Sequence, residues 1–450
     1  MNFIETVKAA GIVGAGGAGF PTHVKLNSKA EYLIINAAEC EPLIETDKFI
    51  CRNFADEVVD AVLKTGAHLG ATKLVIALKG KYVPEIAALK TAINKAGANI
   101  EISEMPTYYP AGDEQSMVQF VTGRSVPERG LPLDVNCVVD NVGTMLNVHN
   151  ALNGTPVCEK FLSVTGDVKN TIMLNVPIGT SLVKCIEQAG PLYDDYIIIE
   201  GGPMMGKVVT DKEKISQAVV TKTTGNVIVL PKDHYLVKRA TLPIETIRHQ
   251  TRSSCIQCRM CTDLCPRYMI GHQMRPHLVM RNMWRENQIT DDQEFLRSFG
   301  DAQNCCDCGA CEMFACPMGL SPRKVNAYFK TKLRERGLSQ ERLMTPEARQ
   351  GINERRIPTE RLVARLGLSE YYHNHAQDCL TLSPESVFVP LRQHIGKPAT
   401  AIVKAGDTVQ KGQLVAEAQE GISANIHTGF AGVVKEVTAD GILICSGGGR

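Results

Sequence analysis

Two features are scarce in this sequence: net charge of either sign and long hydrophobic runs. Its 450 residues include 49 Lys and Arg against 48 Asp and Glu, which leaves a formal net charge of +1. This balance gives no reason to expect nucleic acid or an anionic membrane as a partner. No stretch approaches the about 18 consecutive apolar residues that a membrane-spanning helix needs, so direct membrane insertion is not expected.

The N-terminus lacks a basic stretch followed by a long apolar run, so the sequence predicts a cytoplasmic protein without a secretory signal. Hydrophobic residues make up 44% of the chain and charged residues 22%, which is ordinary for a globular protein. A length of 450 residues suggests about three domains.

Cysteine is abundant and unevenly placed. Nine of the 16 cysteines fall between residues 255 and 316. The other seven are scattered, and we expect them to be small buried residues in a reducing compartment. They are Cys40, Cys51, Cys137, Cys158, Cys185, Cys379 and Cys445.

The clustered cysteines form two similar runs. The first has the spacing C-x2-C-x2-C-x3-C-P and the second C-x2-C-x2-C-x4-C-P. A [4Fe-4S] cluster takes four thiolates; a C-x2-C-x2-C loop supplies three of them and a distant cysteine supplies the fourth. The two runs therefore predict two metal-binding [4Fe-4S] sites. Zinc knuckles and disulfides are the alternatives, but zinc sites use C-x2-C pairs separated by a longer loop.

In two-cluster ferredoxins the fourth cysteine of each run ligates the other cluster. This rule assigns one cluster to Cys255, Cys258, Cys261 and Cys316. It assigns the second cluster to Cys305, Cys308, Cys311 and Cys265. Cys306 is left over, and the second run has one extra residue before Cys316. These two departures mark the cluster closed by Cys316 as the more labile or solvent-facing one.

The 39 residues between the runs are rich in His, Met and Arg at helical spacing. This pattern predicts a helical ferredoxin unit rather than a hairpin. His272, His277 and Met280 could be offered as ligands of a metal or a corrinoid, but packing near the clusters is the favoured interpretation. No D-x-H-x-x-G corrinoid motif is present.

The N-terminal part alternates strand-like and helix-like stretches. Short apolar runs at 32–36 and 73–78 predict strands, and helical spacing predicts helices over 53–69 and 84–96. Such alternation is typical of an α/β layer with mainly parallel strands.

A glycine-rich loop precedes the first clear strand. Gly14-x-Gly16-x-x-Gly19 matches the dinucleotide-binding fingerprint only weakly, because residues 2–10 look helical and Pro21 interrupts the following segment. We therefore reject an ordinary Rossmann site. Adjacent glycines still let backbone N–H groups approach a phosphate, and Lys25 supplies a cation nearby. A plain flexible loop is the alternative.

Polar residues gather in three further segments, 36–42, 109–115 and 140–147. The first leaves a strand end, which is where open α/β sheets bind ligands. Taken singly, each segment is more typical of a turn or a helix cap than of a site.

Taken in order, the patterns GxGGAGFPTxxK, NAxExEP, YxxGDEQ and DNVxTxxN resemble the flavin-bearing, NADH-oxidising subunit of respiratory NADH:quinone oxidoreductase. They resemble more closely the C subunit of the Rnf electron-transport complex. The resemblance covers residues 10 to about 335 and implies an FMN- and NADH-binding flavoprotein. Ala38 and Gly143 depart from it, since the respiratory subunit has acidic residues there.

The implied flavin contacts are Gly14, Gly16, Gly17, Gly19, Lys25, Asn36, Glu39, Asn141 and Thr144. Phe20, Asp113 and Glu114 are implied to lie near the nicotinamide nucleotide. The resemblance implies no separate catalytic side chain.

The expected fold is a multidomain combination of α/β and α+β units. Residues 1–155 form an α/β flavin and NADH domain, and 156–235 a β-grasp module with a linking β segment at 221–234. Residues 240–335 form a helical two-cluster ferredoxin domain, and 336–382 a solvated, charged, helical linker. Residues 383–450 resemble the barrel-sandwich hybrid fold of biotinyl and lipoyl carriers. Their hairpin tip, 417–421, has no lysine, so we expect an interaction module without a covalent cofactor.

This domain order, with the hybrid domain last, resembles the cobalamin reductases of propanediol-utilisation microcompartments. The resemblance implies an oxidoreductase that reduces cob(III)alamin with electrons from NADH and supports adenosylcobalamin regeneration for propanediol degradation. It implies a cobalamin adenosyltransferase and a shell protein as partners, inside a bacterial microcompartment. The alternatives are an Rnf-type subunit working between NADH and ferredoxin, and a non-catalytic iron-sulfur scaffold.

Overall fold

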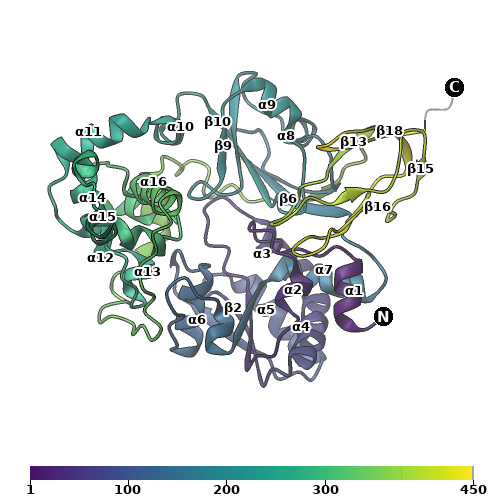
Figure 1. Ribbon diagram of the computed structural model, residues 1–450. Coiled ribbons are helices and arrows are strands. Elements are labelled where there is room, and N and C mark those ends of the chain that lie inside the picture. Colours follow the sequence, from purple (N-terminus) through teal and green to yellow (C-terminus); the bar gives the residue numbers. More distant parts are fainter. Residues whose placement is uncertain (377, 448–450) are drawn as a thin grey trace.

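The computed structural model describes residues 1–376 and 378–447 (Figure 1). Residue 377 of the expected linker and residues 448–450 of the expected C-terminal domain lie outside the described residues. Among the residues described, no helix is both long and apolar enough to cross a membrane.

The N-terminal domain is built on a four-stranded parallel sheet in the order β3-β2-β1-β5. Its strands are β1 (Tyr32–Asn36), β2 (Lys73–Lys79), β3 (Glu101–Met105) and β5 (Cys137–Asn141). Leu33 and Ile35 pack into one apolar core and Ile34 into another. Because successive side chains point to opposite faces, the continuous apolar run means that both faces of the sheet are covered.

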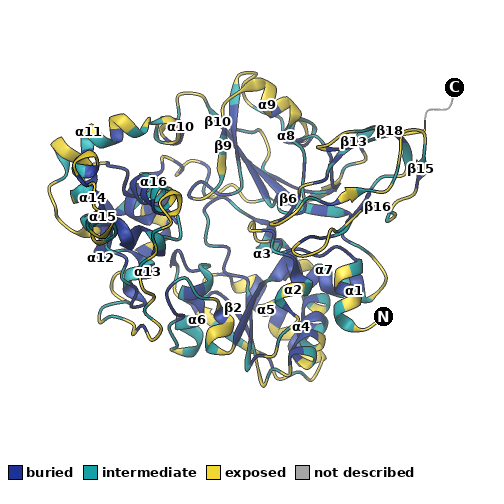
Figure 2. Ribbon diagram, viewed as in Figure 1, coloured by how far each residue is buried: buried dark blue, intermediate teal, exposed yellow. Residues whose placement is uncertain are grey.

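Helices on both sides of this sheet provide the covering (Figures 1 and 2). They are α1 (Phe3–Ala9), α2 (Thr22–Lys25), α3 (Thr46–Asn53), α4 (Ala55–Leu69), α5 (Val83–Lys95), α6 (Glu114–Thr122), η1 (Pro132–Val135) and α7 (Val142–Leu152). The parallel sheet and both expected helices are confirmed. The first helix begins at Ala55 rather than residue 53, because Phe54 leaves helical geometry and separates it from α3.

The glycine-rich loop follows a helix, not a strand. Asn2 caps α1 with a capping box, and the loop then runs to the short helix α2 directly after Pro21. Val13 and Pro21 form an isolated β-bridge. The rejection of an ordinary Rossmann site is therefore confirmed by the local structure.

The second domain is a six-stranded mixed sheet in the order β12-β7-β6-β10-β8-β9. The strands are β6 (Glu159–Gly166), β7 (Ile172–Pro177), β8 (Tyr196–Glu200), β9 (Lys207–Val209), β10 (Asn226–Pro231) and β12 (Cys379–Thr381), with helices α8 (Leu182–Ala189) and α9 (Lys212–Gln217). The expected β segment at 221–234 is confirmed by β10, but the expectation that it only links two domains is wrong. β10 lies between β6 and β8, and its buried apolar residues explain that central place.

The cysteine-rich lobe is helical, as the spacer pattern predicted. Its elements are α10 (Tyr235–Thr241), α11 (Ile244–Ser254), α12 (Met260–Asp263), α13 (Pro266–Met269), α14 (Pro276–Asn282), η2 (Met283–Gln288), α15 (Asp292–Phe299), η3 (Gly300–Asn304), the π-helical turn η4 (Cys311–Ala315) and α16 (Pro322–Glu335). Phe299 and Phe329 stack with ring centroids 3.7 Å apart at the centre of its core.

The expected solvated helical linker at 336–382 is not found. Residues 337–356, all described, form no helix. Then β11 (Ile357–Pro358) pairs with β4 (Tyr108–Tyr109), α17 (Thr359–Arg365) follows, and β12 joins the six-stranded sheet. The prediction weighed the many charges and missed the apolar face formed by Leu362, Val363 and Leu366, which is fully buried.

The C-terminal domain consists of two small sheets, β13-β19-β18-β15 and β14-β16-β17. The strands are β13 (Ser386–Pro390), β14 (Thr400–Ala401), β15 (Thr408–Val409), β16 (Leu414–Glu417), β17 (Ile426–His427), β18 (Gly432–Val437) and β19 (Gly441–Cys445). Both sheets contribute to one apolar core. The domain packs beside the N-terminal domain, and the buried Lys222 amine donates to the carbonyls of both Gly11 and Asn425 (Figure 1).

Candidate functional site

The glycine-rich loop lies against the end of β5 and the start of α7. The backbone N–H of Ala15 donates to Thr144 Oγ1 at 3.0 Å. Gly16 and Gly17 are exposed, and a Cβ on Gly16 would meet the Asn141 side chain at 3.4 Å. Gly17 has a φ of +113° and open space around it. This exposed, glycine-only backbone suits close approach by a phosphate.

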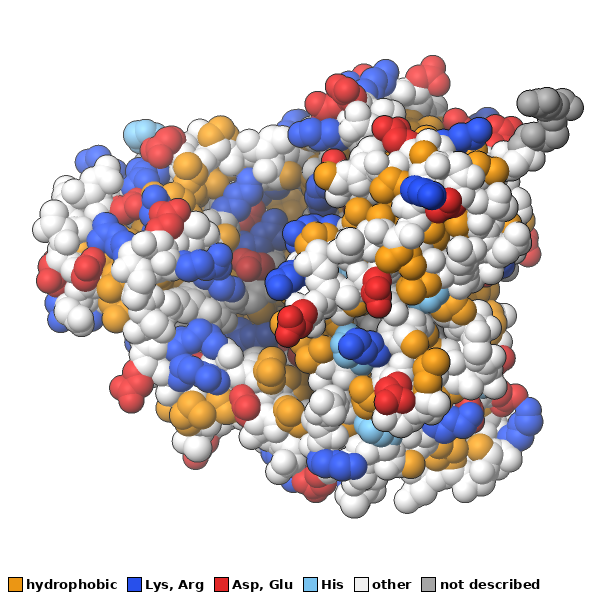
Figure 3. All heavy atoms as spheres, turned by 45° about the vertical axis from the view of Figure 1, so that its right-hand side comes forward, with side chains coloured by type: hydrophobic (Ala, Val, Ile, Leu, Met, Phe, Trp, Pro, Cys, Tyr) orange, Lys and Arg blue, Asp and Glu red, His pale blue; other side chains and the backbone are white. Residues whose placement is uncertain are grey.

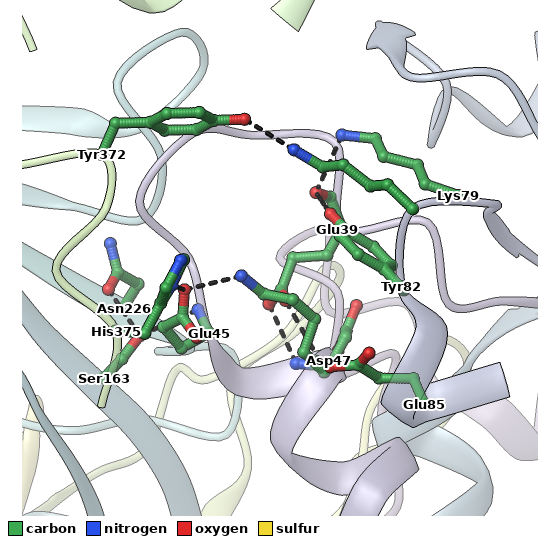
Figure 4. A network of polar contacts seen from close by, with 12 residues as sticks. Glu39, Glu45, Asp47, Lys79, Tyr82, Glu85, Ser163, Asn226, Tyr372 and His375 are labelled. Atoms are coloured by element: carbon green, nitrogen blue, oxygen red, sulfur yellow. Dashed lines mark hydrogen bonds and ion pairs between the residues drawn. The ribbon is translucent and has the colours of Figure 1, made fainter. Parts of the chain in front are cut away.

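Glu39 and Asn141 are held together through α3. The Glu39 carboxylate accepts the backbone N–H groups of Asp47 at 2.9 Å and Lys48 at 3.2 Å, so it caps the first turn of α3 (Figure 4). Asn141 Nδ2 donates to Asp47 Oδ2 at 2.8 Å. Burial raises the pKa of Glu39 to about 8, and the neighbouring Asp47 adds to the shift.

Lys25 joins the loop to β5 and to the second polar segment. Its Nζ donates to the Val139 carbonyl at 2.8 Å and lies 3.4 Å from Glu114. Burial lowers the pKa of Lys25, but attraction to Asp140 and Glu114 outweighs burial and leaves this pKa raised. Lys25 is therefore a fixed cation at this edge of the sheet.

Asn36 joins two more of the predicted segments. Its Nδ2 donates to the Gly112 carbonyl at 2.9 Å, and its Oδ1 accepts the Ala38 N–H at 3.1 Å. Gly14 donates its N–H to the Phe20 carbonyl at 2.9 Å, and Gly19 is packed below the C-terminal domain, where its carbonyl accepts the Ile395 N–H. The predicted flavin residues are thus collected at the carboxyl edge of one parallel sheet.

The two departures from the family pattern have local explanations. A Cβ on Gly143 would lie 3.1 Å from Asn141 Oδ1 and 3.3 Å from Ile50 Cδ1, so a larger side chain would crowd the cap of α7. Ala38 is fully buried in an apolar cluster. An acidic side chain at Ala38 would have to bury its charge there.

Asp113 points to the cysteine-rich lobe. Its carboxylate accepts Arg267 Nη2 at 2.8 Å, also contacts Arg267 Nη1, and caps α6 through the Ser116 N–H at 3.0 Å. The Arg267 pair outweighs burial and holds the pKa of Asp113 below its usual range. The sequence prediction missed Arg267, although its place two residues after Cys265 was a usable signal.

A second contact, a hydrogen bond, also joins the N-terminal domain to the cysteine-rich lobe. The buried Tyr109 hydroxyl donates to the Cys308 carbonyl at 2.6 Å. Tyr109 belongs to one of the polar segments of the sequence, but its hydroxyl contact could not be read from spacing. Together with Arg267, it holds the cysteine loops against the N-terminal domain.

Five cysteines line one cavity: Cys265, Cys305, Cys306, Cys308 and Cys311. The four that the crossing rule groups, all but Cys306, are here called the inner set. Burial raises the pKa of Cys265 to about 12. Cys265 comes from the first run and the other three from the second. The structure thus brings together the cysteines that the crossing rule grouped.

The other set, the outer set, contains Cys255, Cys258, Cys261 and Cys316. Burial raises the pKa of Cys261 to about 12, and the nearby sulfurs of Cys316, Cys255 and Cys258, together with that of the inner Cys265, add to the shift. Cys258 is exposed. The Cys316 sulfur accepts the Leu320 N–H at 3.3 Å, and the Cys255 sulfur accepts Gln257 Nε2 at 3.1 Å. Cluster ligation by both sets stays a prediction.

A buried, unpaired amide also lines the cavity of the inner set. Within residues 1–376 and 378–447, no three His, Cys, Asp or Glu side chains are grouped so as to hold a metal ion. Asn326 lines the same cavity, is 1% exposed, and has neither a donor nor an acceptor partner for its amide. An unpaired buried amide is costly, so the cavity suits a group that can accept its N–H, as cluster sulfur can.

The alternative ligands in the spacer have ordinary contacts. His272 lies 2.8 Å from the Val126 carbonyl, His277 lies 2.7 Å from Thr262 Oγ1, and Met280 is part of the apolar core. These contacts match the packing interpretation. Of the scattered cysteines, Cys51, Cys137, Cys158 and Cys185 are buried as expected, whereas Cys40, Cys379 and Cys445 are half-buried.

A separate cleft of about 490 Å³ opens between the N-terminal domain and the segment after α17. Glu39, Glu41, Lys79 and Lys81 line one wall, and Tyr372 lies across from them and accepts Lys81 Nζ at 2.7 Å (Figure 4). Burial raises the pKa of Glu41 to about 7. Figure 3 shows a hollow in one face of the molecule with Lys and Arg side chains gathered in it. Sequence reasoning assigned Glu39 to the flavin site and placed Glu41 in the same polar segment, 36–42, but it did not predict the lysines or Tyr372.

Three parts of the chain match models of known protein families. Residues 7–150 match the Nuo51 FMN-binding domain, residues 254–321 a 4Fe-4S dicluster domain, and residues 375–445 the RnfC barrel sandwich hybrid domain. The C-terminal sheets thus form the barrel-sandwich fold that the sequence predicted.

The chain is similar along nearly its whole length to two characterised proteins. It is 40% identical to the cobalamin reductase PduS of Citrobacter freundii and 41% identical to that of Salmonella typhimurium, in each case over 98% of this chain and 96% of the relative. It is also 33% identical to the C subunit of the Na(+)-translocating ferredoxin:NAD(+) oxidoreductase complex of Acetobacterium woodii, over 62% of this chain and 61% of that relative.

Proposed function

This chain belongs to the family of the cobalamin reductase PduS, and from that premise we propose that it is an NADH-dependent reductase of cob(III)alamin. In this proposal it carries FMN and two [4Fe-4S] clusters. When bound, the flavin takes two electrons from NADH as hydride and releases them one at a time, which a cluster can accept. The chain is therefore a converter between a two-electron donor and a one-electron acceptor.

The flavin site in this proposal is the edge of the parallel sheet. The exposed backbone of Gly16 and Gly17 would bind the phosphate, and Lys25, kept charged by Asp140 and Glu114, would balance its charge. Asn36, Glu39, Asn141 and Thr144 fix the loops around it through the hydrogen bonds described above. Phe20, Asp113 and Glu114 are proposed to border the nicotinamide nucleotide.

The observation that carries the proposal is the pair of polar contacts between the N-terminal domain and the loops of the inner cysteines. Arg267 and Asp113 form a pair whose side chains are 11% and 13% exposed, and Tyr109 bonds the backbone of Cys308. These contacts hold the inner set beside the flavin edge. The outer set lies next, and its exposed Cys258 offers the exit to an external acceptor.

Anaerobic electron transfer by the purified, reconstituted full chain tests this function. NADH should bleach the flavin absorbance and then reduce added hydroxocobalamin, while the protein holds two clusters by iron and acid-labile sulfide analysis. Zinc in stoichiometric amount in place of iron would contradict the cluster assignment.

The similarity to the ferredoxin:NAD(+) oxidoreductase complex favours a second candidate, electron transfer between NADH and ferredoxin. Reduction of added ferredoxin with cobalamin left oxidised would select it. Absence of flavin binding after reconstitution would leave a non-catalytic iron-sulfur scaffold as the remaining interpretation.

Because the chain belongs to the PduS family, we extend the proposal to its location and its partners. The chain would act within a propanediol-utilisation microcompartment, bound to a shell protein, and supply reduced cobalamin to an adenosyltransferase for adenosylcobalamin regeneration. Co-purification with the microcompartment fraction, lost when the shell is disrupted, tests this location.

A further inference from the structure

One buried amide near the inner cysteines has no partner in the protein. Asn326 lies on α16, is 1% exposed, and lines the cavity formed by the inner set. Neither its Nδ2 nor its Oδ1 makes a hydrogen bond to a described residue. Most buried side-chain amides are paired, so an unpaired one calls for a partner absent from the chain itself.

Two neighbours of Asn326 on its helix are apolar, so an asparagine at this position needs an explanation. Val325 and Phe329, its neighbours on α16, pack into the apolar core of the lobe. Asn326 instead faces the cysteine cavity. An apolar residue of similar size would fill this place without the desolvation cost of an amide, so packing alone does not explain the asparagine.

A second hydrogen-bond donor lines the cavity, but its N–H groups already contact other protein groups. Arg323 also lines the cavity, but its guanidinium donates to the Met204 carbonyl and lies 3.9 Å from Glu312. Asn326 therefore offers a polar side chain with free N–H groups facing the place where the inner set would hold its cluster.

We propose that Asn326 Nδ2 donates a hydrogen bond to a sulfur of the [4Fe-4S] cluster held by the inner set, and thereby raises the reduction potential of that cluster. The inference rests on the proposed function. A reduced cluster carries one more negative charge than the oxidised cluster, so a donor to its sulfur stabilises the reduced form more. Asn326 is in this view a positioning and tuning residue, not a ligand.

Asn326→Leu is the first test, because leucine has the same branched arrangement of side-chain heavy atoms and no donor. Its inner cluster should be harder to reduce by about tenfold in the equilibrium constant, which is about 59 mV for one electron. The measurement is an anaerobic redox titration followed by EPR, with iron and sulfide content determined on the same samples. Thr331→Leu, an exposed change on the same helix, should leave the potential at the wild-type value.

A wild-type protein without clusters would refute the proposed function, whereas an Asn326→Leu protein with both clusters and an unchanged potential would refute this inference alone. If the leucine variant fails to assemble its inner cluster, a measurement on the wild-type protein tests the inference instead. Asparagine labelled with ¹⁵N only in its side-chain amide should give a ¹⁵N coupling to the reduced inner cluster in pulsed EPR. Absence of that coupling would overturn the inference.

Discussion

The inner and outer cysteine sets share one sequence pattern but lie in different surroundings. Inner Cys265, Cys308 and Cys311 are 7%, 8% and 6% exposed, and their loops are bonded to the N-terminal domain. In the outer set Cys261 and Cys316 are equally buried and Cys255 is half-buried, as is the inner Cys305, but Cys258 is exposed. The two sets therefore differ at Cys258 and in the hydrogen bonds that join the inner set to the N-terminal domain. The expectation that the cluster closed by Cys316 is the solvent-facing one stays a prediction, because Cys316 itself is buried and only Cys258 of its set is exposed.

Loss of an inner ligand should have the largest effect. Cys308→Ser removes a thiolate from the buried set, so we expect loss of the inner cluster and a fall of cobalamin reduction to background. NADH should still bleach the flavin, because the glycine loop and Lys25 are untouched. EPR and stopped-flow absorbance on the same preparation measure both. Cobalamin reduction at the wild-type rate would show that electrons bypass the inner set.

The buried ion pair beside the inner set should contribute far more to the free energy of unfolding than the exposed ion pair beside the outer set. Arg267→Met leaves the buried Asp113 charge unpaired, and we expect the free energy of unfolding to fall by about 3 to 5 kcal/mol. Arg259→Met is the matched control, since Arg259 and Asp263 are 50% and 32% exposed and such pairs are worth about 0 to 1 kcal/mol. Urea unfolding compares the two, and equal losses would contradict the difference in burial.

The free energy of unfolding should also depend on pH through the buried Glu41. Burial raises the pKa of Glu41 from 4.5 to about 7 in the folded chain. Between these values the folded state keeps a proton that the unfolded state has released, so the free energy of unfolding should fall as pH rises from 4.5 to 7. We expect a loss of about 1 to 3 kcal/mol. Glu41→Gln should make this slope shallower in urea titrations but not abolish it, because Glu39, whose pKa burial raises to about 8, contributes a slope of the same sign. An unchanged slope would assign it to other groups.

The smallest expected contrast is in resistance to chelators. A chelator reaches the exposed Cys258 side first, so iron should leave in two phases, with the outer cluster lost before the inner one. Iron release followed by absorbance, with EPR of the remaining cluster, measures the order. Release in a single phase, or loss of the inner cluster first, would remove the distinction in accessibility.

Local patterns in the sequence predicted much of the fold. The apolar runs at 32–36 and 73–78 predicted parallel strands, and the spacer between the cysteine runs predicted helices, because periodicity reports burial directly. The grouping of Cys265 with the second run and of Cys316 with the first followed from a chemical rule for clusters. The structure places Cys265 beside the second run and Cys316 near Cys261, and the ligation itself stays a prediction.

What could not be predicted depends on contacts between distant segments. The bonds from Arg267 to Asp113 and from Tyr109 to Cys308 join residues 154 and 199 positions apart. Nothing in local spacing specifies such a pairing. The charged segment after α16 was misjudged for a related reason: its few apolar residues pack against Tyr109 and the inner set, and only the tertiary structure reveals that surface.

The central claim is that electrons pass from the flavin through the inner set to the outer set and leave there for cobalamin. Rapid-freeze EPR of the Cys258→Ser variant, mixed anaerobically with NADH and hydroxocobalamin, tests it most directly. We expect the inner cluster to be reduced at the wild-type rate while cobalamin stays oxidised. Cobalamin reduction at the wild-type rate in a variant shown to lack the outer cluster would contradict the claim.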